Sequence, residues 1–173
     1  MGDIRFDGRT AIVTGAGAGL GKSHALELAR RGAKVVVNDL GGSVDGSGGS
    51  ASAAQAVADE IKAAGGEAIA HGANVTKADE VADMVEQAVK AFGGVDILVN
   101  NAGILRDKSF TKMTLEDFQA VVDVHLMGSV TCTKAVWDMM KEAGYGRIVM
   151  TSSSSGIYGN FGQSNYGAAK MGL

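Results

Sequence analysis

The sequence predicts an α/β fold built on a doubly wound, parallel sheet, and three observations support this. Short apolar segments rich in β-branched residues alternate with longer segments of helical periodicity. A glycine-rich turn, TGAGAGLGKS at residues 14–23, joins the first apolar segment to the first helical one. Strand, glycine turn, helix and strand follow one another within about thirty residues, which makes a βαβ unit with parallel strands.

Each element is predicted from its own residues. Strands are expected at residues 10–14, 34–38, 67–70, 95–99 and 147–152. Helices are expected at residues 20–31, 51–64, 77–92 and 114–141, the last with a break near Gly128, and from Tyr166 onward. Gly32 stops the first helix, and Thr114 with Asp117 resembles a capping box. Residues 40–50 are predicted to be a loop because glycine and serine dominate them.

The composition is that of one domain spanning residues 1–173. Of the 173 residues, 46% are hydrophobic and 20% are charged, and the chain shows neither an internal repeat nor a linker. A net charge of −3 without a basic stripe argues against a nucleic-acid partner. No apolar run approaches the ~20 residues of a bilayer span, and the charged N-terminus lacks a signal-peptide core. No membrane partner is therefore predicted.

Cysteine and histidine usage gives two further predictions. Cys132 is the only cysteine, so an internal disulfide is impossible and a reducing, cytoplasmic location is predicted. His24, His71 and His125 lie far apart and lack the spacing of zinc ligands, so no metal site is predicted.

The glycine turn is compatible with two kinds of phosphate-binding loop. Gly21, Lys22 and Ser23 match the end of a P-loop, but the opening glycine of that motif would have to stand at Ala16. The common dinucleotide pattern G-x-G-x-x-G fails as well, because its third glycine would fall at Leu20. The turn alone therefore leaves both interpretations open.

Asp39 favours the dinucleotide interpretation. It ends the second predicted strand about twenty residues after the glycines, where an acid can bond the ribose hydroxyls of adenosine. A carboxylate at this place repels a 2′-phosphate, so NAD is predicted in preference to NADP. The alternative is an aspartate that opens the loop before Gly41 and Gly42.

Three motifs in order resemble the short-chain dehydrogenase/reductase family. They are T-G-x-x-x-G-x-G at Thr14–Gly21, N-N-A-G at Asn100–Gly103, and Y-x-x-x-K at Tyr166 and Lys170. The resemblance covers essentially the whole chain and implies a Rossmann-like domain that binds NAD.

The resemblance also implies a set of cofactor residues. Gly15, Gly19, Leu20 and Gly21 correspond to the diphosphate turn and Asp39 to the ribose ligand. Asn74 and Val75 correspond to the adenine-side pair, where the family more often has Asp-Val. Asn101, Ala102 and Gly103 correspond to the segment behind the nicotinamide ribose, although Asn100 and Asn101 can equally just secure the strand.

Three longer segments indicate a subgroup of that family. VVVNDLGG at residues 35–42, NNAGILRD at 100–107 and TSSSSGIYGNFGQSNYGAAK at 151–170 resemble the (3R)-hydroxyacyl-CoA dehydrogenase part of type 2 peroxisomal multifunctional enzymes and its bacterial relatives. This implies hydride transfer between NAD and a small-molecule secondary alcohol, a (3R)-3-hydroxyacyl-CoA.

Tyr166 and Lys170 are four residues apart, so on a helix they share one face. A free phenol is a poor base at neutral pH, and a nearby ammonium stabilises its phenolate. The same lysine can hold the nicotinamide ribose. The family's catalytic serine stands thirteen residues before the tyrosine, which selects Ser153. Its hydroxyl would steady the charge that develops on the substrate oxygen.

His125 departs from the family pattern. Most members have an asparagine here that completes a catalytic tetrad, largely through its main-chain carbonyl and a water. His125 is therefore a candidate for the same proton relay, and a purely structural role is equally open.

The end of the chain is the larger departure. The family continues with a sixth strand and a segment that covers the substrate, so the sheet is predicted to be C-terminally incomplete. Family members associate through helices, which implies a homo-oligomer for a full-length chain. Alternatives to the dehydrogenase are an NAD-binding fragment without activity, a short-chain dehydrogenase for a different alcohol and, most remotely, a P-loop phosphotransferase.

Overall fold

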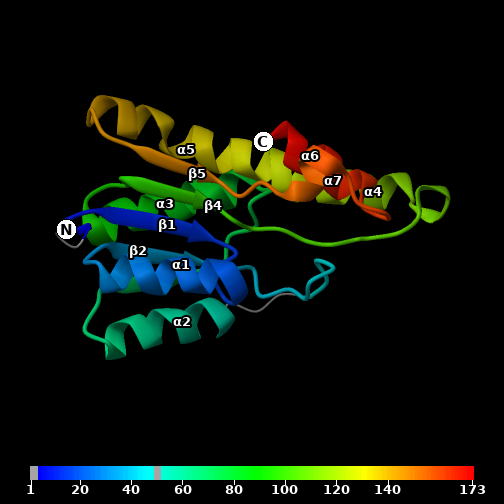
Figure 1. Cartoon of the computed structure of the whole chain (residues 1–173). Helices are drawn as coiled ribbons and strands as arrows, with labels where there is room; N and C mark the ends of the chain where they lie inside the picture. Colours follow the sequence, from blue (N-terminus) through cyan, green and yellow to red (C-terminus); the bar gives the residue numbers. More distant parts are fainter. Residues whose placement is uncertain (1–3, 49–51) are drawn as a thin grey trace.

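The computed structural model describes residues 4–48 and 52–173, and a parallel sheet forms its centre (Figure 1). The strands are β1 (Thr10–Thr14), β2 (Lys34–Asn38), β3 (Ala68–His71), β4 (Ile97–Asn100) and β5 (Arg147–Met150). They stand in the order β3-β2-β1-β4-β5, and every neighbouring pair is parallel. The predicted doubly wound, Rossmann-like sheet is confirmed.

Helices connect the strands and cover both faces of the sheet. They are α1 (Gly19–Arg30), α2 (Ser52–Ala63), α3 (Ala78–Phe92), α4 (Leu115–Val122), α5 (Gly128–Glu142), α6 (Ser154–Tyr158) and α7 (Ser164–Gly172). The predicted long helix is α4 and α5 joined by a π-helical turn at Asp123–Met127, so the break precedes Gly128. Short α6 and a 3₁₀ turn at Phe110–Lys112 were not predicted. The predicted loop end at Ser50 and helix start at Ala51 lie outside the described residues.

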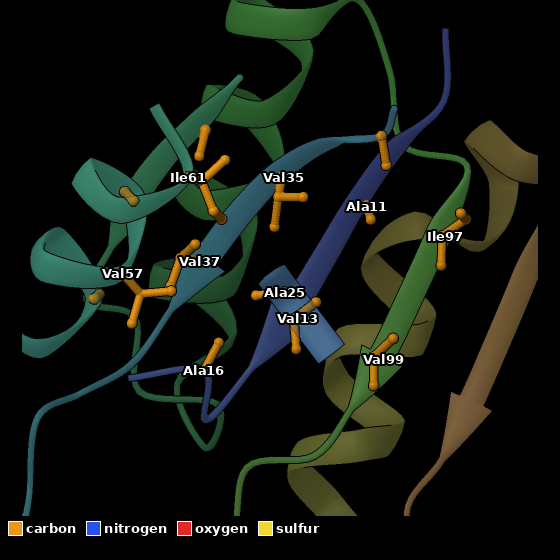
Figure 2. Packing of buried hydrophobic residues seen from close by; sticks show 14 residues of the cluster. Ala11, Val13, Ala16, Ala25, Val35, Val37, Val57, Ile61, Ile97 and Val99 are labelled. Atoms are coloured by element: carbon orange, nitrogen blue, oxygen red, sulfur yellow. The ribbon is translucent and has the colours of Figure 1, made fainter. Parts of the chain in front are cut away.

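The hydrophobic core has two halves, one on each face of the sheet, because successive strand residues point to opposite faces. Ala11 and Val13 point to one face, where they pack with residues of α1 and α2, as Figure 2 shows for the buried cluster around Val57 and Ile61. Ile12 points to the other face and packs with residues of α3 and α5. Side chains in the three central strands are apolar in succession because helices bury both faces.

The topology places the carboxyl ends of the strands at one edge. From β1 the chain moves outward to β2 and β3, then returns to the other side of β1 for β4 and β5. The switch point therefore lies between β1 and β4, where ligands bind in open α/β sheets.

Candidate functional site

The turn after β1 is packed so closely that only glycine fits at two of its positions. Gly15 has a left-handed φ of +62°, and a Cβ there would lie 2.8 Å from the Cα of Ala102. A Cβ on Gly21, in the first turn of α1, would collide with the carbonyl oxygen of Gly15. A Cβ on Gly19 would meet no atom within 4 Å, so this side of the turn is open. Ala18, the N-cap, has no side-chain acceptor, so the first amides of α1 are available to a diphosphate.

Lys22 and Leu20 lie on the outside of the same helical turn. The Lys22 ammonium pairs with the carboxylate of Glu60 in α2 at 2.8 Å, and Leu20 is largely exposed. A P-loop lysine must reach the phosphates, whereas Lys22 is engaged by a neighbouring helix. The geometry thus favours the dinucleotide interpretation of the glycine turn.

Asp39 ties the turns after β1 and β2 together. One carboxylate oxygen accepts a hydrogen bond from the Gly17 amide at 2.7 Å, and the other accepts one from the Gly41 amide at 2.7 Å. A Cβ on Gly17 would lie 2.9 Å from this carboxylate. Asp39 can therefore both open the loop and bind a ribose. A carboxylate has about four acceptor positions, and the two loop amides use only two of them.

Asn74 and Val75 lie in the loop that follows β3. The Asn74 side chain accepts hydrogen bonds from the Thr76 amide at 3.0 Å and from its hydroxyl at 2.9 Å. Val75 is buried, and its side chain fills the space that a Cβ on Gly128 would need. The Asn38 side chain bonds both backbone groups of Ala73 and so fixes this loop beside β2. Asn74 and Val75 thus lie beyond the carboxyl end of β3, and the Asn74 side chain is hydrogen-bonded to Thr76 within the same turn.

Asn101 and Thr14 join the ends of β4 and β1. The Asn101 amide side chain donates to the carbonyls of Thr14 and Gly15, both at 3.0 Å. The Thr14 hydroxyl accepts from the backbone amides of Asn101 and Ala102, also at 3.0 Å. Thr14 was not predicted as a site residue, although its place at the head of the glycine motif was the available signal.

Asn100 is buried at the end of β4. Its amide nitrogen lies 3.2 Å from the Thr133 hydroxyl and 3.4 Å from the Met150 sulfur. These contacts join β4 to α5 and β5, which fits the structural interpretation of this residue.

Lys170 lies buried beside the aromatic ring of Tyr166, as the helical spacing predicts. Its Nζ is 5.5 Å from the ring centre and donates to the carbonyl oxygen of Thr151, at the end of β5. Burial lowers the pKa of the Lys170 ammonium from its ordinary 10.5 to about 8. At neutral pH the group is still mostly a cation, and it is held next to the phenol by the backbone.

Ser153 is the residue before α6 and caps that helix. Its hydroxyl oxygen accepts from the Ser155 amide at 3.2 Å, while the neighbouring Ser152 hydroxyl donates to the Lys170 carbonyl at 2.8 Å. Ser152 thus binds α7, whereas Ser153 caps α6 just beyond the end of β5.

His125 lies between Gly103, in the segment after β4, and Tyr166 in α7. Its ring stands edge-on to the Tyr166 ring with 5.1 Å between centres, and it occupies the space beside Gly103 that a Cβ would need. Its Nε2 lies 3.1 Å from the amide nitrogen and 2.8 Å from the carbonyl oxygen of Ile104. Burial lowers the pKa of His125 to about 4, so the ring is neutral at pH 7.

The predicted residues thus gather at one edge of the sheet. An open groove of about 490 Å³ lies instead between α6 and α7, where Phe110, Phe161 and Met171 line it. None of the four predicted catalytic side chains lines this groove. In the described part of the chain, no group of three or more His, Cys, Asp or Glu side chains is placed to hold a metal ion. No described helix combines the length and apolarity that a membrane crossing requires.

A sequence-family comparison decides the assignment. The model of the short chain dehydrogenase family matches residues 9–173. The chain belongs to this family. The members of this family are oxidoreductases, and they generally use NAD or NADP as the cofactor.

Curated relatives are similar over nearly the whole chain. Peroxisomal multifunctional enzyme type 2 of Drosophila melanogaster is 62% identical over 99% of this chain and 28% of its own length. Peroxisomal hydratase-dehydrogenase-epimerase of Saccharomyces cerevisiae is 55% identical over 99% of this chain and 19% of its own length. The chain therefore spans less than a third of these two relatives.

Two solved structures share the fold. A short chain dehydrogenase from Mycobacterium avium superposes with a TM-score of 0.85 at 52% identity, covering 96% of this chain and 59% of its own. A 7α-hydroxysteroid dehydrogenase complexed with NADH and 7-oxo glycochenodeoxycholic acid gives a TM-score of 0.88 at 35% identity. That match covers 97% of this chain and 62% of the other.

The prediction of a cytoplasmic location is wrong. Four relatives between 54% and 62% identical are peroxisomal enzymes by name. The single cysteine rules out an internal disulfide, but this does not distinguish the cytoplasm from a peroxisome.

Proposed function

We propose that this chain binds NAD and catalyses hydride transfer between NAD and a secondary alcohol, a (3R)-3-hydroxyacyl-CoA. One observation carries the proposal: the buried Lys170 ammonium is held beside Tyr166 by the Thr151 carbonyl, at the sheet edge that also bears the open glycine turn. The proposed reaction needs both parts, a cation that stabilises a phenolate and a turn that binds a diphosphate.

The proposed cofactor site follows the carboxyl edge. The residues present fit a dinucleotide, because the outer side of the glycine turn is open and the first amides of α1 have no side-chain cap. Gly15, Gly19, Leu20 and Gly21 would hold the diphosphate, Asp39 the adenosine ribose, and Asn74 with Val75 the adenine side. Asn101, Ala102 and Gly103 would back the nicotinamide ribose, with Tyr166 and Lys170 bonding its hydroxyls. Bound NAD would supply the hydride acceptor.

The catalytic roles follow from the contacts of each side chain. Tyr166 takes the hydroxyl proton of the substrate as the carbon of that alcohol loses its hydride, and the two electrons leave with the hydride. Lys170 stabilises the phenolate form of Tyr166 that accepts this proton, from its place on the Thr151 carbonyl. Ser153 bonds the substrate oxygen and steadies its charge in the transition state. His125, neutral and packed against Tyr166, positions the ring and the segment behind the nicotinamide.

NAD is proposed in preference to NADP because of the charge at Asp39. Its carboxylate is fixed by the amides of Gly17 and Gly41, so it cannot turn away from a 2′-phosphate without breaking both bonds. A phosphate placed there would meet a fixed negative charge.

The substrate class is proposed from the peroxisomal relatives, and with it a peroxisomal location. A steroid alcohol is the main alternative substrate, because a 7α-hydroxysteroid dehydrogenase shares the fold. A fragment that binds NAD without turnover is the alternative for the activity, since this chain spans under a third of its curated relatives.

One experiment separates these possibilities. The protein is mixed with NAD⁺ and either the (3R) or the (3S) enantiomer of a 3-hydroxyacyl-CoA, and NADH formation is followed by absorbance. We expect turnover with the (3R) enantiomer alone, and with NAD⁺ far better than with NADP⁺. NADH binding without turnover of any alcohol would leave the fragment alternative, while failure to bind NADH would overturn the whole proposal.

A further inference from the structure

The loop after β2 contains an ordered segment, residues 43–47, here called the strap. Its serine and aspartate side chains close it on itself. The Ser43 amide donates to the Ser47 carbonyl at 2.8 Å, and the Gly46 amide donates to the Ser43 carbonyl at 2.9 Å. The Asp45 carboxylate accepts from the Ser47 amide at 3.0 Å and from the Ser47 hydroxyl at 2.8 Å, and it also bonds the Ser43 hydroxyl. The strap is therefore a compact turn, although its composition predicts a flexible loop.

The strap lies against the segment after β4, residues 104–106. The Leu105 amide donates to the Val44 carbonyl at 2.8 Å, and Arg106 Nε donates to the Asp45 carbonyl at 3.1 Å. The backbone of Gly46 packs on the Ile104 side chain, so closely that a Cβ on the glycine would lie 3.1 Å from it. Figure 1 shows the two loops leaving the same edge of the sheet and extending in the same direction.

The sheet order determines what the contact encloses. β1 lies between β2 and β4, so the loops after β2 and β4 leave from either side of the glycine turn. They close a ring with the turn that begins at Gly15, because Asp39 bonds Gly17, Asn101 bonds Gly15, and Leu105 bonds Val44. A dinucleotide on that turn would lie inside this ring.

The two sides of the ring differ in how firmly they are held. Residues 104–106 are bonded to the catalytic side, because Ile104 contacts His125 and the Arg106 carbonyl accepts from Asn165 of α7 at 3.1 Å. Asn165 is completely buried. The strap is exposed, with Val44 at 70%, and the bonds above tie it to the rest of the molecule. The strap is thus the side that can open.

We propose that the strap closes over the bound dinucleotide by pairing with residues 104–106, and that its opening controls cofactor exchange. This rests on the proposed binding of NAD. In the closed state the pairing keeps both halves of the cofactor enclosed, and His125 and Asn165 transmit the position of residues 104–106 to the helix that carries Tyr166.

A reversible cross-link tests the proposal. Val44→Cys with Leu105→Cys places two thiols where the backbones are hydrogen-bonded, while Cys132 is buried and its pKa is raised to about 12, so it stays unreactive. The oxidised and reduced forms of the same protein are compared by stopped-flow NADH fluorescence. We expect oxidation of the loaded protein to trap NADH, oxidation of the empty protein to block binding, and reduction to restore exchange.

A second pair of variants tests whether loosening the strap speeds cofactor release. Asp45→Ala removes the acceptor that organises the strap, and Asp59→Ala removes an exposed acceptor of Gln55 in α2 as the matched control. We expect Asp45→Ala to raise the NADH dissociation rate at least about 10-fold, since it removes the acceptor of three hydrogen bonds that organise the strap. Asp59→Ala should leave the rate unchanged.

The outcomes separate the two proposals. If the unaltered protein does not bind NADH, the proposed function itself fails. If it binds NADH, but cross-linked, reduced and Asp45→Ala proteins all exchange it at the same rate, the strap proposal alone is overturned. Thiols that do not oxidise under mild conditions would contradict the pairing of the two segments.

Discussion

β1 and β5 belong to one sheet but lie in very different surroundings. All five residues of β1 are buried, and backbone and side-chain bonds from β4 hold its carboxyl end. In β5 exposed and half-buried residues alternate, and nearby Tyr158 and Phe161 are 85% and 89% exposed. Helix α7, which carries Tyr166 and Lys170, is held by a few bonds, among them those of Lys170 to Thr151 just after β5 and of Asn165 to Arg106. Cofactor binding is thus expected to withstand perturbations that abolish turnover.

The largest expected effect separates the two regions by function. Tyr166→Phe removes the proposed proton acceptor, so turnover is expected to fall by about 10³-fold. NADH affinity should fall by no more than about tenfold, because one hydrogen bond to the nicotinamide ribose is lost while the glycine turn and Asp39 are untouched. Steady-state rates and a fluorescence titration measure the two quantities. A residual rate within about tenfold of the original would contradict the acid–base role of Tyr166.

A substitution in the proposed cofactor region should instead abolish NADH binding. In Gly21→Ala the new methyl group collides with the Gly15 carbonyl, which a rigid turn cannot relieve. We expect a loss of about 3 kcal/mol in unfolding free energy and no NADH binding. Gly144→Ala is the control, since φ is +63° there but no atom lies within 4 Å of the new Cβ. It should cost ~1 kcal/mol and spare binding; equal effects of the two variants would refute the packing argument.

His125, between the two regions, makes stability depend on pH. Burial lowers its folded-state pKa from 6.5 to about 4, so between these values the unfolded chain takes up a proton that the folded chain does not. Stability is therefore lost as pH falls from 6.5 toward 4, by about 3 kcal/mol in total. Urea unfolding at several pH values measures the loss. His125→Asn should lack this component, and an identical pH dependence in both proteins would disprove the assignment.

Matched truncations compare the packing of the two strands directly. Val36→Ala in β2 removes a completely buried side chain and is expected to cost about 2 kcal/mol of unfolding free energy. Val149→Ala in β5 shortens a side chain that is 48% exposed, and we expect less than about 0.5 kcal/mol. Thermal or chemical unfolding of both variants gives the difference. Similar costs would show that β5 is buried in solution.

Lys22→Ala should have the smallest effect. It breaks an exposed ion pair with Glu60, which is worth no more than about 0.5 kcal/mol. NADH affinity should not change, because the ammonium points to α2. A large loss of affinity, or a preference of the unaltered protein for ATP with Mg²⁺, would support the P-loop interpretation.

The fold was predictable because its pattern is local. Segments such as Thr10–Thr14 and Lys34–Asn38 are short, apolar and flanked by glycine or helix, and their predicted bounds match the structure. Helix α6 was missed because SSSSG has the composition of a loop, and its order depends on bonds such as Ser155 to Gln163. The π-helical turn was missed because a shift in hydrogen bonding leaves the apolar periodicity intact.

The candidate site was predictable where it depends on residue type. The glycine spacing, Asp39 and the Tyr166–Lys170 pair all follow from the sequence. Contacts made by backbone groups, such as the Thr151 carbonyl with Lys170 or Ile104 with His125, carry no signal of residue type. Burial, which sets the charge of His125 and lowers the pKa of Lys170, likewise emerges only from the packed structure.

The position of β1 at the centre of the sheet has a consequence for biosynthesis. Its bonds to β4 and the residues around it join positions 85 to 88 apart in the chain. While the chain is being made, β1 can pair with β2 early, but its other edge stays open until β4 has left the ribosome. A growing chain therefore carries an unpaired apolar strand edge while at least 85 further residues are translated, the state in which nascent proteins associate wrongly.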